Sequence, residues 1–303
     1  MSKPIPTILC FGEILWDFLP AGLFAGGAPF NVAYHLHQLG NVALPVSALG
    51  RDVLGEELLR RLRSSGIGTD LISHHHGLPT GTVRADLDAG GNAHYEIATS
   101  VAWDQISVSE DVVRAATGAD ALVFGSLALR SSFNRNALER ILSVLPAGAL
   151  RVFDVNLRPP HDNLDLVREL APRAYVLKLN AEEAARLAGG PPEAPGSEEV
   201  HARALAAAHG CEIVCISAGA RGAGLLHNRT WSWEAGRPVT VVDTIGAGDA
   251  FVASLTSDLV GGRPPDAEVL ARACRLGEWV ATQSGATPAY GSTTPVNPRN
   301  RHP

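Results

Sequence analysis

One short segment in the carboxyl-terminal half combines glycines with an acidic residue. Val239–Val242 form an apolar, β-branched run that predicts a strand, and the chain continues with Gly246, Ala247, Gly248 and Asp249 into an apolar helical pattern. Glycines at a strand-to-helix turn let the backbone approach a ligand closely, and the positive end of the new helix suits phosphate. An aspartate binds phosphate poorly because the two negative charges repel. We therefore expect Asp249 to act in catalysis where a phosphoryl group is transferred; the alternative is an ordinary first-turn acid.

A second glycine-rich segment lies near the amino end. Gly26 and Gly27 precede the first long helical pattern, and Asn31 falls in its first turn. The amide of Asn31 offers both a donor and an acceptor, which suits a sugar hydroxyl. Upstream, Asp17 follows the first apolar strand, and a carboxylate can accept hydrogen bonds from two vicinal hydroxyls. Asp17 is therefore a sugar-binding candidate, with an exposed loop acid as the alternative.

Short apolar runs alternate with helical patterns along most of the chain. Continuously apolar runs are typical of a parallel sheet covered on both faces, so the alternation predicts an α/β fold with a doubly wound, mostly parallel sheet and helices on both faces. The whole chain, residues 1–303, is expected to form one domain. The expected strands are Ile8–Phe11, Pro45–Ala48, Ala121–Phe124, Arg151–Asp154, Tyr175–Leu179 and Ile213–Ser217. The expected helices are Phe30–Leu39, Val108–Ala116 (opened by a capping box of Ser107 and Glu110), Asn134–Leu145, Asn180–Leu187, Ser197–Ala208, Asp249–Leu259 and Val269–Thr282.

The segment Pro79–Ala98 breaks this alternation. Polar and apolar residues alternate there around Asp88–Asn92, which predicts a β-hairpin. A hairpin inserted into a strand–helix scaffold usually serves as a lid or an interface. We expect a small β lid formed by about residues 14–28 and 79–100. An amphipathic hairpin fits a homodimer through the lid, and it equally fits a monomer whose lid packs on its own site.

Composition excludes several classes of function. The chain has 303 residues, 46% of them hydrophobic, and a net charge of −6 without a basic block, which argues against nucleic acid and an anionic membrane as partners. No apolar run reaches membrane-spanning length, and the residues after Met1 form no secretory stretch. The four cysteines contain no Cys-x-x-Cys pair. A reducing cytoplasm is the expected location.

The two glycine motifs together resemble the PfkB (ribokinase-like) sugar kinase family. The pattern Gly26-Gly27-x-x-x-Asn31 near one end and Asp243-Thr244-x-Gly246-Ala247-Gly248-Asp249 near the other place the resemblance over essentially the whole chain. Bacterial fructokinases are the most similar branch, on the segments Gly12–Asp17, Gly26–Asn31 and Asp154–Pro159. Ribokinases usually carry a lysine where this chain has Ala28, which favours an acceptor other than ribose.

This resemblance implies an ATP-dependent kinase that transfers the γ-phosphate to a hydroxyl of a monosaccharide, with fructose as the expected acceptor. Asp249 would be the general base, and the N–H groups of Gly246, Ala247 and Gly248 would form an anion hole. Arg158 would add positive charge, with a surface arginine as the alternative. The residues expected to bind the sugar are Asp17, Gly26, Gly27, Asn31 and Asp249.

The resemblance also implies a nucleotide site with metal ions. Asn180 and Glu183, one helical turn apart, would orient Mg²⁺ through water, with an ordinary helix acid as the alternative for Glu183. Asp243 and Ile245 would form a monovalent-cation site with the carbonyls of Gln283–Thr287, and whether K⁺ binds there is open. The expected nucleotide-binding residues are Asn180, Ser217, Gly219, Gly222, Thr244, Gly246, Gly248 and Cys274. Family members often carry an asparagine near the position of Cys274, so the contact to the base is open.

Three alternatives remain at the level of sequence. The same chemistry could act on 2-keto-3-deoxygluconate, ribose or a nucleoside. A catalytically silent relative could sense sugar, but the chain keeps Asp249, Gly246 and Gly248. A dinucleotide-binding oxidoreductase should carry a glycine-rich turn after the first strand, and Gly12 leads instead into Glu13–Trp16.

Overall fold

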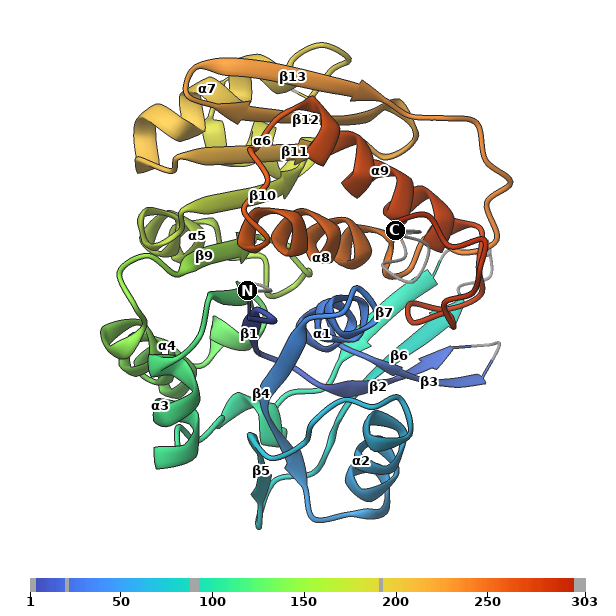
Figure 1. Ribbon diagram of the computed structural model, residues 1–303. Coiled ribbons are helices and arrows are strands. Elements are labelled where there is room, and N and C mark those ends of the chain that lie inside the picture. Colours follow the sequence, from blue (N-terminus) through green and yellow to red (C-terminus); the bar gives the residue numbers. More distant parts are fainter. Residues whose placement is uncertain (1–3, 20–21, 88–92, 191–192, 297–303) are drawn as a thin grey trace.

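The computed structural model describes residues 4–19, 22–87, 93–190 and 193–296, and its centre is a nine-stranded sheet (Figure 1). The order across the sheet is β13-β12-β11-β10-β9-β8-β1-β4-β5. All neighbouring pairs run parallel except β11–β12 and β12–β13, which are antiparallel. The strands are β1 Thr7–Phe11, β4 Val42–Gly50, β5 Ile72–His75, β8 Ala121–Gly125, β9 Leu150–Asp154, β10 Val176–Asn180, β11 Ile213–Ser217, β12 Gly222–His227 and β13 Thr230–Ala235.

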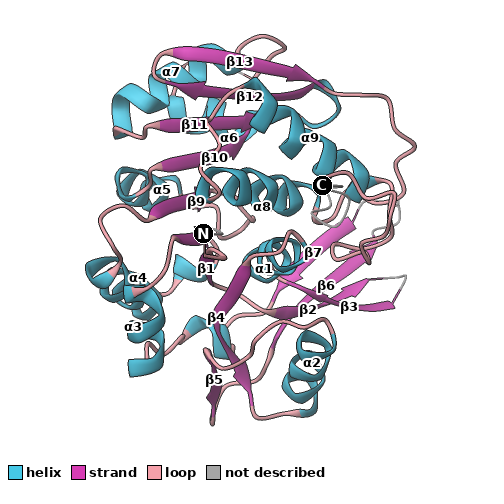
Figure 2. Cartoon of the chain, viewed as in Figure 1, coloured by secondary structure: helices cyan, strands magenta, loops and turns pink. Residues whose placement is uncertain are grey.

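Helices cover both faces of this sheet, as Figure 2 shows. Strand residues alternate between the two sides, so Ile8 and Cys10 of β1 pack into the core beneath α1, α8 and α9, whereas Leu9 and Phe11 pack into the core beneath α3 to α7. The helices are α1 Ala28–Gln38, α2 Val53–Ser64, α3 Glu110–Thr117, α4 Ser132–Val144, α5 Leu164–Leu170, α6 Ala181–Ala188, α7 Glu198–His209, α8 Ala247–Val260 and α9 Ala267–Ala281. The expected doubly wound, mostly parallel α/β fold is therefore confirmed.

A second, four-stranded sheet lies beside the carboxyl ends of these strands, with the order β3-β2-β6-β7 (Figure 1). Its strands are β2 Leu15–Leu19, β3 Gly22–Gly26, β6 Gly81–Leu87 and β7 Ala93–Ile97. The antiparallel pairing of β6 with β7 confirms the expected hairpin; its turn, 88–92, lies outside the described residues, as does most of the carboxyl-terminal tail. The sheet occupies the segments expected for a lid, and the movement of a lid stays a prediction.

The expected strand Val239–Val242 is wrong. These residues form no strand, and 38% of Val239, 56% of Val241 and 63% of Val242 are exposed. The main sheet already ends at β13, so the β-branched run has no neighbouring strand to pair with. The N–H groups of Val242 and Asp243 donate instead to the carbonyl of Ala281 at the end of α9. The strand propensity of these residues was therefore not sufficient, because no neighbouring strand is available to pair with them.

The expected capping box of Ser107 and Glu110 is also wrong. Helix α3 begins at Glu110, and its N-cap is Ser109, whose hydroxyl accepts a hydrogen bond from the Val112 N–H. Both serines have the right chemistry, and the burial of Val112 and Ala116 sets which one lies at the helix end.

Among the described residues, none of the helices combines the length and the apolar character that crossing a bilayer requires.

Candidate active site

The site lies where parallel strands of the main sheet end, because the carboxyl ends of neighbouring parallel strands share one edge. A cavity of about 770 Å³ opens there. It brings together nine of the residues expected from the sequence: Asp17, Gly27, Asn31, Arg158, Thr244, Ile245, Gly246, Gly248 and Asp249. The small sheet contributes aliphatic side chains to the same cavity, namely Leu15, Leu19, Val83 and Ile97.

Asp249 lies in the first turn of α8 and is 8% exposed. The Asn31 amide, from the first turn of α1, donates a hydrogen bond of 2.8 Å to Asp249 Oδ2. Burial raises the pKa of Asp249 to about 6, and the nearby charge of Asp154 acts in the same direction, while Asn31, Arg158 and Lys178 oppose it. A carboxyl group with this pKa can take up a proton near neutral pH and still be ionised before the reaction.

The turn before Asp249 is held tightly against a second loop. Gly246 has φ of +79°, and a Cβ there would lie 2.6 Å from Ala286, so only glycine fits. Asp243 joins the two segments, because its carboxylate accepts hydrogen bonds from the N–H groups of Ile245 (2.9 Å) and Gly285 (3.3 Å). The first N–H groups of α8 have no partner within their own helix. The Ala247 N–H donates to the Thr244 carbonyl at 3.3 Å, and Gly246 and Gly248 line the cavity. This arrangement suits an anion.

Asp17 belongs to β2, whose side chains alternate between two surroundings. Leu15, Asp17 and Leu19 line the cavity, whereas Trp16 is fully buried on the other face and donates its ring N–H to the Leu54 carbonyl at 2.9 Å. A Cβ on Gly26, the partner of Leu15 in β3, would lie 2.0 Å from the Asp17 carboxylate. Gly26 therefore makes room for Asp17, and burial raises the pKa of Asp17 to about 6.

A buried ion pair lies beside Asp249. Lys178 Nζ is 3.1 Å from Asp154 Oδ1, and both side chains are less than a tenth exposed. Burial alone would lower the pKa of Lys178, but the carboxylates of Asp154, Glu183 and Asp249 outweigh it and raise that pKa. Neither member of the pair is among the site residues expected from the sequence. The available signal was a lysine among the apolar residues Val176, Leu177 and Leu179 of β10.

Glu13 is a further residue of the cavity that is not among the site residues expected from the sequence. It follows β1, lines the cavity and is 3% exposed. Burial raises the pKa of Glu13 to about 7, against the backbone N–H groups of Glu13 itself and Ala28, which favour the ionised form. A buried acid directly after a strand is the signal that could have found it.

Arg158 extends from the segment after β9 and is exposed at the rim of the cavity. Its guanidinium donates to the carbonyl of Leu157 at 3.0 Å. The remaining donors of this side chain are free to turn toward an anionic ligand, since that bond engages Nη1 alone. The expected role for Arg158 stays a prediction, supported by its place in the cavity wall.

Asn180 and Glu183 form a reciprocal capping box at the start of α6. The Asn180 side chain accepts from the Glu183 N–H, and the Glu183 carboxylate accepts from the N–H groups of Asn180 (2.8 Å) and Leu157 (2.7 Å). Among the described residues, no three His, Cys, Asp or Glu side chains form a group able to hold a metal ion. Oxygen donors and the exposure of Asn180 fit a contact to Mg²⁺ through water, and that contact stays a prediction.

The other residues expected at the nucleotide do not line the cavity around Asp249. Ser217 ends β11, and its hydroxyl donates to the Leu179 carbonyl at 3.4 Å. Gly219 and Gly222 flank the short turn into β12, and Cys274 lies in α9, 8% exposed. Their roles at the nucleotide stay predictions.

Comparison with known proteins decides the family. The model of the pfkB family carbohydrate kinases matches residues 21–292. The chain belongs to the pfkB family of carbohydrate kinases. A fructokinase from Salmonella typhimurium is 30% identical over 93% of this chain and 94% of its own length. This member of the family is therefore similar to fructokinases along nearly all of its sequence.

Solved structures extend the comparison of this kinase. A fructokinase double mutant from Vibrio cholerae O395, bound to fructose, ADP and a potassium ion, has a TM-score of 0.80 at 22% identity, with 95% of this chain and 96% of that chain covered. Aminoimidazole riboside kinase from Salmonella enterica, bound to its riboside and an ATP analogue, has a TM-score of 0.76 at 24% identity, with 93% and 95% covered. At these identities the likeness shows a shared fold, which serves both a hexose and a riboside.

Proposed function

We propose that this carbohydrate kinase transfers the γ-phosphate of ATP to a hydroxyl group of a neutral monosaccharide, with fructose as the expected acceptor. The observation that carries the proposal is the Asp249 carboxylate, buried in the first turn of α8 and held by Asn31 within the cavity. In the reaction, the acceptor oxygen forms a bond to the γ-phosphorus and the bond from that phosphorus to the ADP oxygen breaks. The acceptor's proton passes to Asp249.

The charges of the cavity support a neutral acceptor. Among the described residues, its wall contains the acids Glu13, Asp17, Asp154 and Asp249 and two basic side chains, Lys178 and Arg158. Lys178 is already paired with Asp154. A sugar acid such as 2-keto-3-deoxygluconate would bring another carboxylate into this surplus of negative charge, whereas sugar hydroxyls can donate to carboxylates. Ribose and nucleosides are neutral and remain alternatives, as does a silent sugar-sensing relative.

Residues around the transferred group would then act as follows. The N–H groups of Gly246, Ala247 and Gly248 would stabilise the charge on the phosphoryl group, with Arg158 at the rim adding to it. Asp17, Gly27 and Asn31 would orient the sugar, and the aliphatic side chains of the small sheet would exclude water. Mg²⁺, held through water by Asn180 and Glu183, would neutralise charge on the nucleotide phosphates when bound.

Three further expectations belong to this proposal. Asp243 and Ile245 are the expected K⁺ ligands. The hydrogen bond from the Gly285 N–H to Asp243 holds their turn against the loop expected to complete that site.

The small sheet is the expected surface of a homodimer. The four buried free cysteines suit a reducing cytoplasm.

The test is the release of ADP from MgATP with a panel of sugars, sugar acids and nucleosides, for the wild type and Asp249→Asn. We expect turnover of fructose that falls about 1,000-fold or more in the variant, because a positioned general base contributes 10²–10⁴-fold. Turnover of another acceptor would replace fructose and keep the mechanism. No Asp249-dependent turnover of any acceptor would overturn the assignment and favour a sensor.

A further inference from the structure

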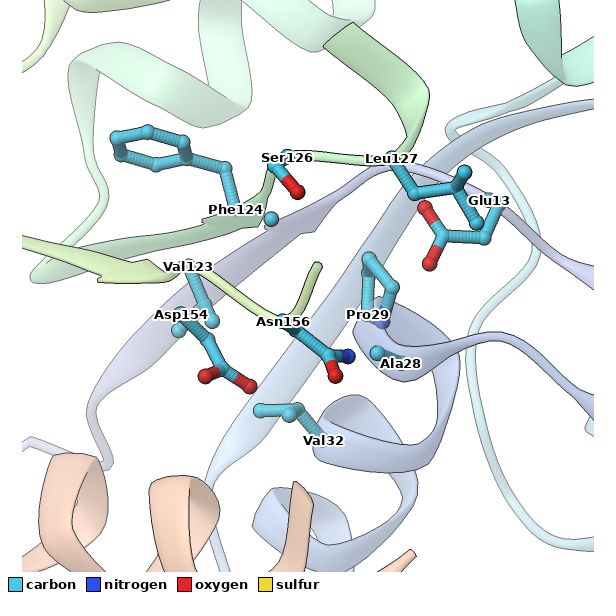
Figure 3. Close-up of a pocket in the computed structure, with 11 residues that line it drawn as sticks. Glu13, Ala28, Pro29, Val32, Val123, Phe124, Ser126, Leu127, Asp154 and Asn156 are labelled. Carbon is cyan, nitrogen blue, oxygen red and sulfur yellow. The ribbon is translucent and has the colours of Figure 1, made fainter. Parts of the chain in front are cut away.

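A small recess opens beside the cavity, and polar side chains border it. Figure 3 shows Glu13, Ser126, Asp154 and Asn156 around it, from the segments at the carboxyl ends of β1, β8 and β9. Its volume of about 10 Å³ is the space of a single water-sized oxygen. The recess and the cavity share five lining residues, Glu13, Ala28, Leu127, Asp154 and Asn156. The recess is therefore a side pocket of the proposed acceptor site.

Two atoms in its wall are buried without a hydrogen bond. Among the residues that the structure describes, the Ser126 hydroxyl and Glu13 Oε2 have no hydrogen-bond partner, although both side chains are only 3% exposed. A buried polar atom left unpaired costs about 1–3 kcal/mol, so such atoms usually have a partner in the working protein.

The donor and acceptor groups match one kind of occupant. The Ser126 hydroxyl can donate, and the Glu13 carboxylate can only accept when it is ionised. A hydroxyl group between them could accept from Ser126 and donate to Glu13, whereas a methyl group could do neither. Glu13 also has a structural role, because the Ala28 N–H at the start of α1 interacts with its carboxylate. That interaction leaves Oε2 available.

We propose that the recess receives one hydroxyl group of the acceptor sugar, different from the hydroxyl that attacks the phosphate, and that Ser126 and Glu13 select for it. The inference rests on the proposed function, because it needs a sugar in the cavity. A single buried water has the same hydrogen-bonding chemistry as a hydroxyl group and is the competing occupant. The experiment must therefore distinguish a group of the substrate from a water molecule.

The experiment measures kcat/KM for the best acceptor and for its monodeoxy analogues, in the wild type and in Ser126→Ala. Apart from the analogue that lacks the attacking hydroxyl, we expect one analogue to lose about 100-fold or more in the wild type, since a site built to bond a hydroxyl rejects a substrate without it. In Ser126→Ala that loss should shrink to less than about tenfold, while the losses of the other analogues stay unchanged.

Two further variants keep the test decisive. Ser47→Ala removes another buried hydroxyl without a hydrogen bond, in β4 and outside both pockets, so it should leave every ratio unchanged. Glu13→Gln retains the shape of the side chain and replaces one acceptor oxygen with an NH₂ group, so it should reduce the loss for the same analogue as Ser126→Ala does. If either Ser126→Ala or Glu13→Gln does not fold, the other variant still tests the proposal.

Each outcome has one meaning. If the losses of all analogues are equal in the wild type and Ser126→Ala, the recess holds water and the proposal is overturned while the sugar kinase stands. If the wild type phosphorylates no acceptor, the proposed function fails and the recess proposal falls with it. A loss confined to one analogue and relieved by both variants supports the proposal.

Discussion

The acceptor side and the expected nucleotide side of this site are built differently. Around the acceptor cavity, buried side chains carry the chemistry, and the pKa values of Glu13, Asp17 and Asp249 are raised by burial. On the expected nucleotide side, the chain offers the short turn Gly219–Arg221 with Gly222 directly after it. Side chains that hold buried charges depend closely on one another, whereas backbone turns depend little on any single side chain. Substitutions should therefore have much larger effects on the acceptor side.

The largest effect is expected at Asp249, where activity and stability should move in opposite directions. Its folded pKa of about 6 lies above the usual 3.8, so its favourable contribution is complete below the usual value and is lost as pH rises through about 6. At pH 8 the free energy of unfolding of Asp249→Asn should therefore exceed that of the wild type by on the order of 1–3 kcal/mol, and the variant should melt at a higher temperature. The difference should be smaller at pH 5. Thermal melts at both pH values measure this.

An exposed aspartate provides the control for that prediction. Asp70 is exposed, and Asp70→Asn should leave the melting temperature nearly unchanged at both pH values. If the stability advantage of Asp249→Asn over the wild type is no larger at pH 8 than at pH 5, burial does not destabilise the ionised carboxylate and the prediction is wrong.

A smaller effect is expected from Asn31, which stabilises the ionised form of Asp249 through its hydrogen bond. The acid limb of the kcat/KM profile should have its midpoint near pH 6 in the wild type, because activity requires ionised Asp249. In Asn31→Ala the pKa of Asp249 should rise, so the limb should move to higher pH by about half a unit to one unit. Asn41 is equally buried but bonds to Leu36 and Ser257, and Asn41→Ala should leave the limb in place.

The smallest effect is expected on the nucleotide side. Cys274 is 8% exposed, and burial raises the pKa of its thiol to about 12, so the side chain stays neutral. Cys274→Ala should change KM for ATP by less than about threefold, which corresponds to under ~0.7 kcal/mol, and leave KM for the sugar unchanged. A tenfold or larger change in KM for ATP would show that a side chain matters here too, and it would remove the contrast between the two sides.

The elements that the sequence placed correctly are those with a strong local signal. The core strands are mostly apolar, and Asn180, the N-cap of helix α6, is followed three residues later by the acid needed for a capping box. The errors fall where two local solutions were equally good. Ser107 and Ser109 can both cap a helix, and Val239–Val242 has the composition of a strand. In both cases contacts made in the folded protein determined which conformation formed.

The sequence by itself determined the two glycine motifs, the strand–helix alternation and the identity of Asp249 and Asn31, because each depends on residues close together in the chain. Only the tertiary structure showed that Asn31 bonds to Asp249 across 218 positions of sequence, and that Glu13, Asp154 and Lys178 belong to the same cavity. Glu13 follows the end of β1, Asp154 ends β9, and Lys178 lies in the neighbouring β10, so parallel pairing of the strands is what brings the three together. Burial then raises the pKa values, and burial is a property of the folded chain alone.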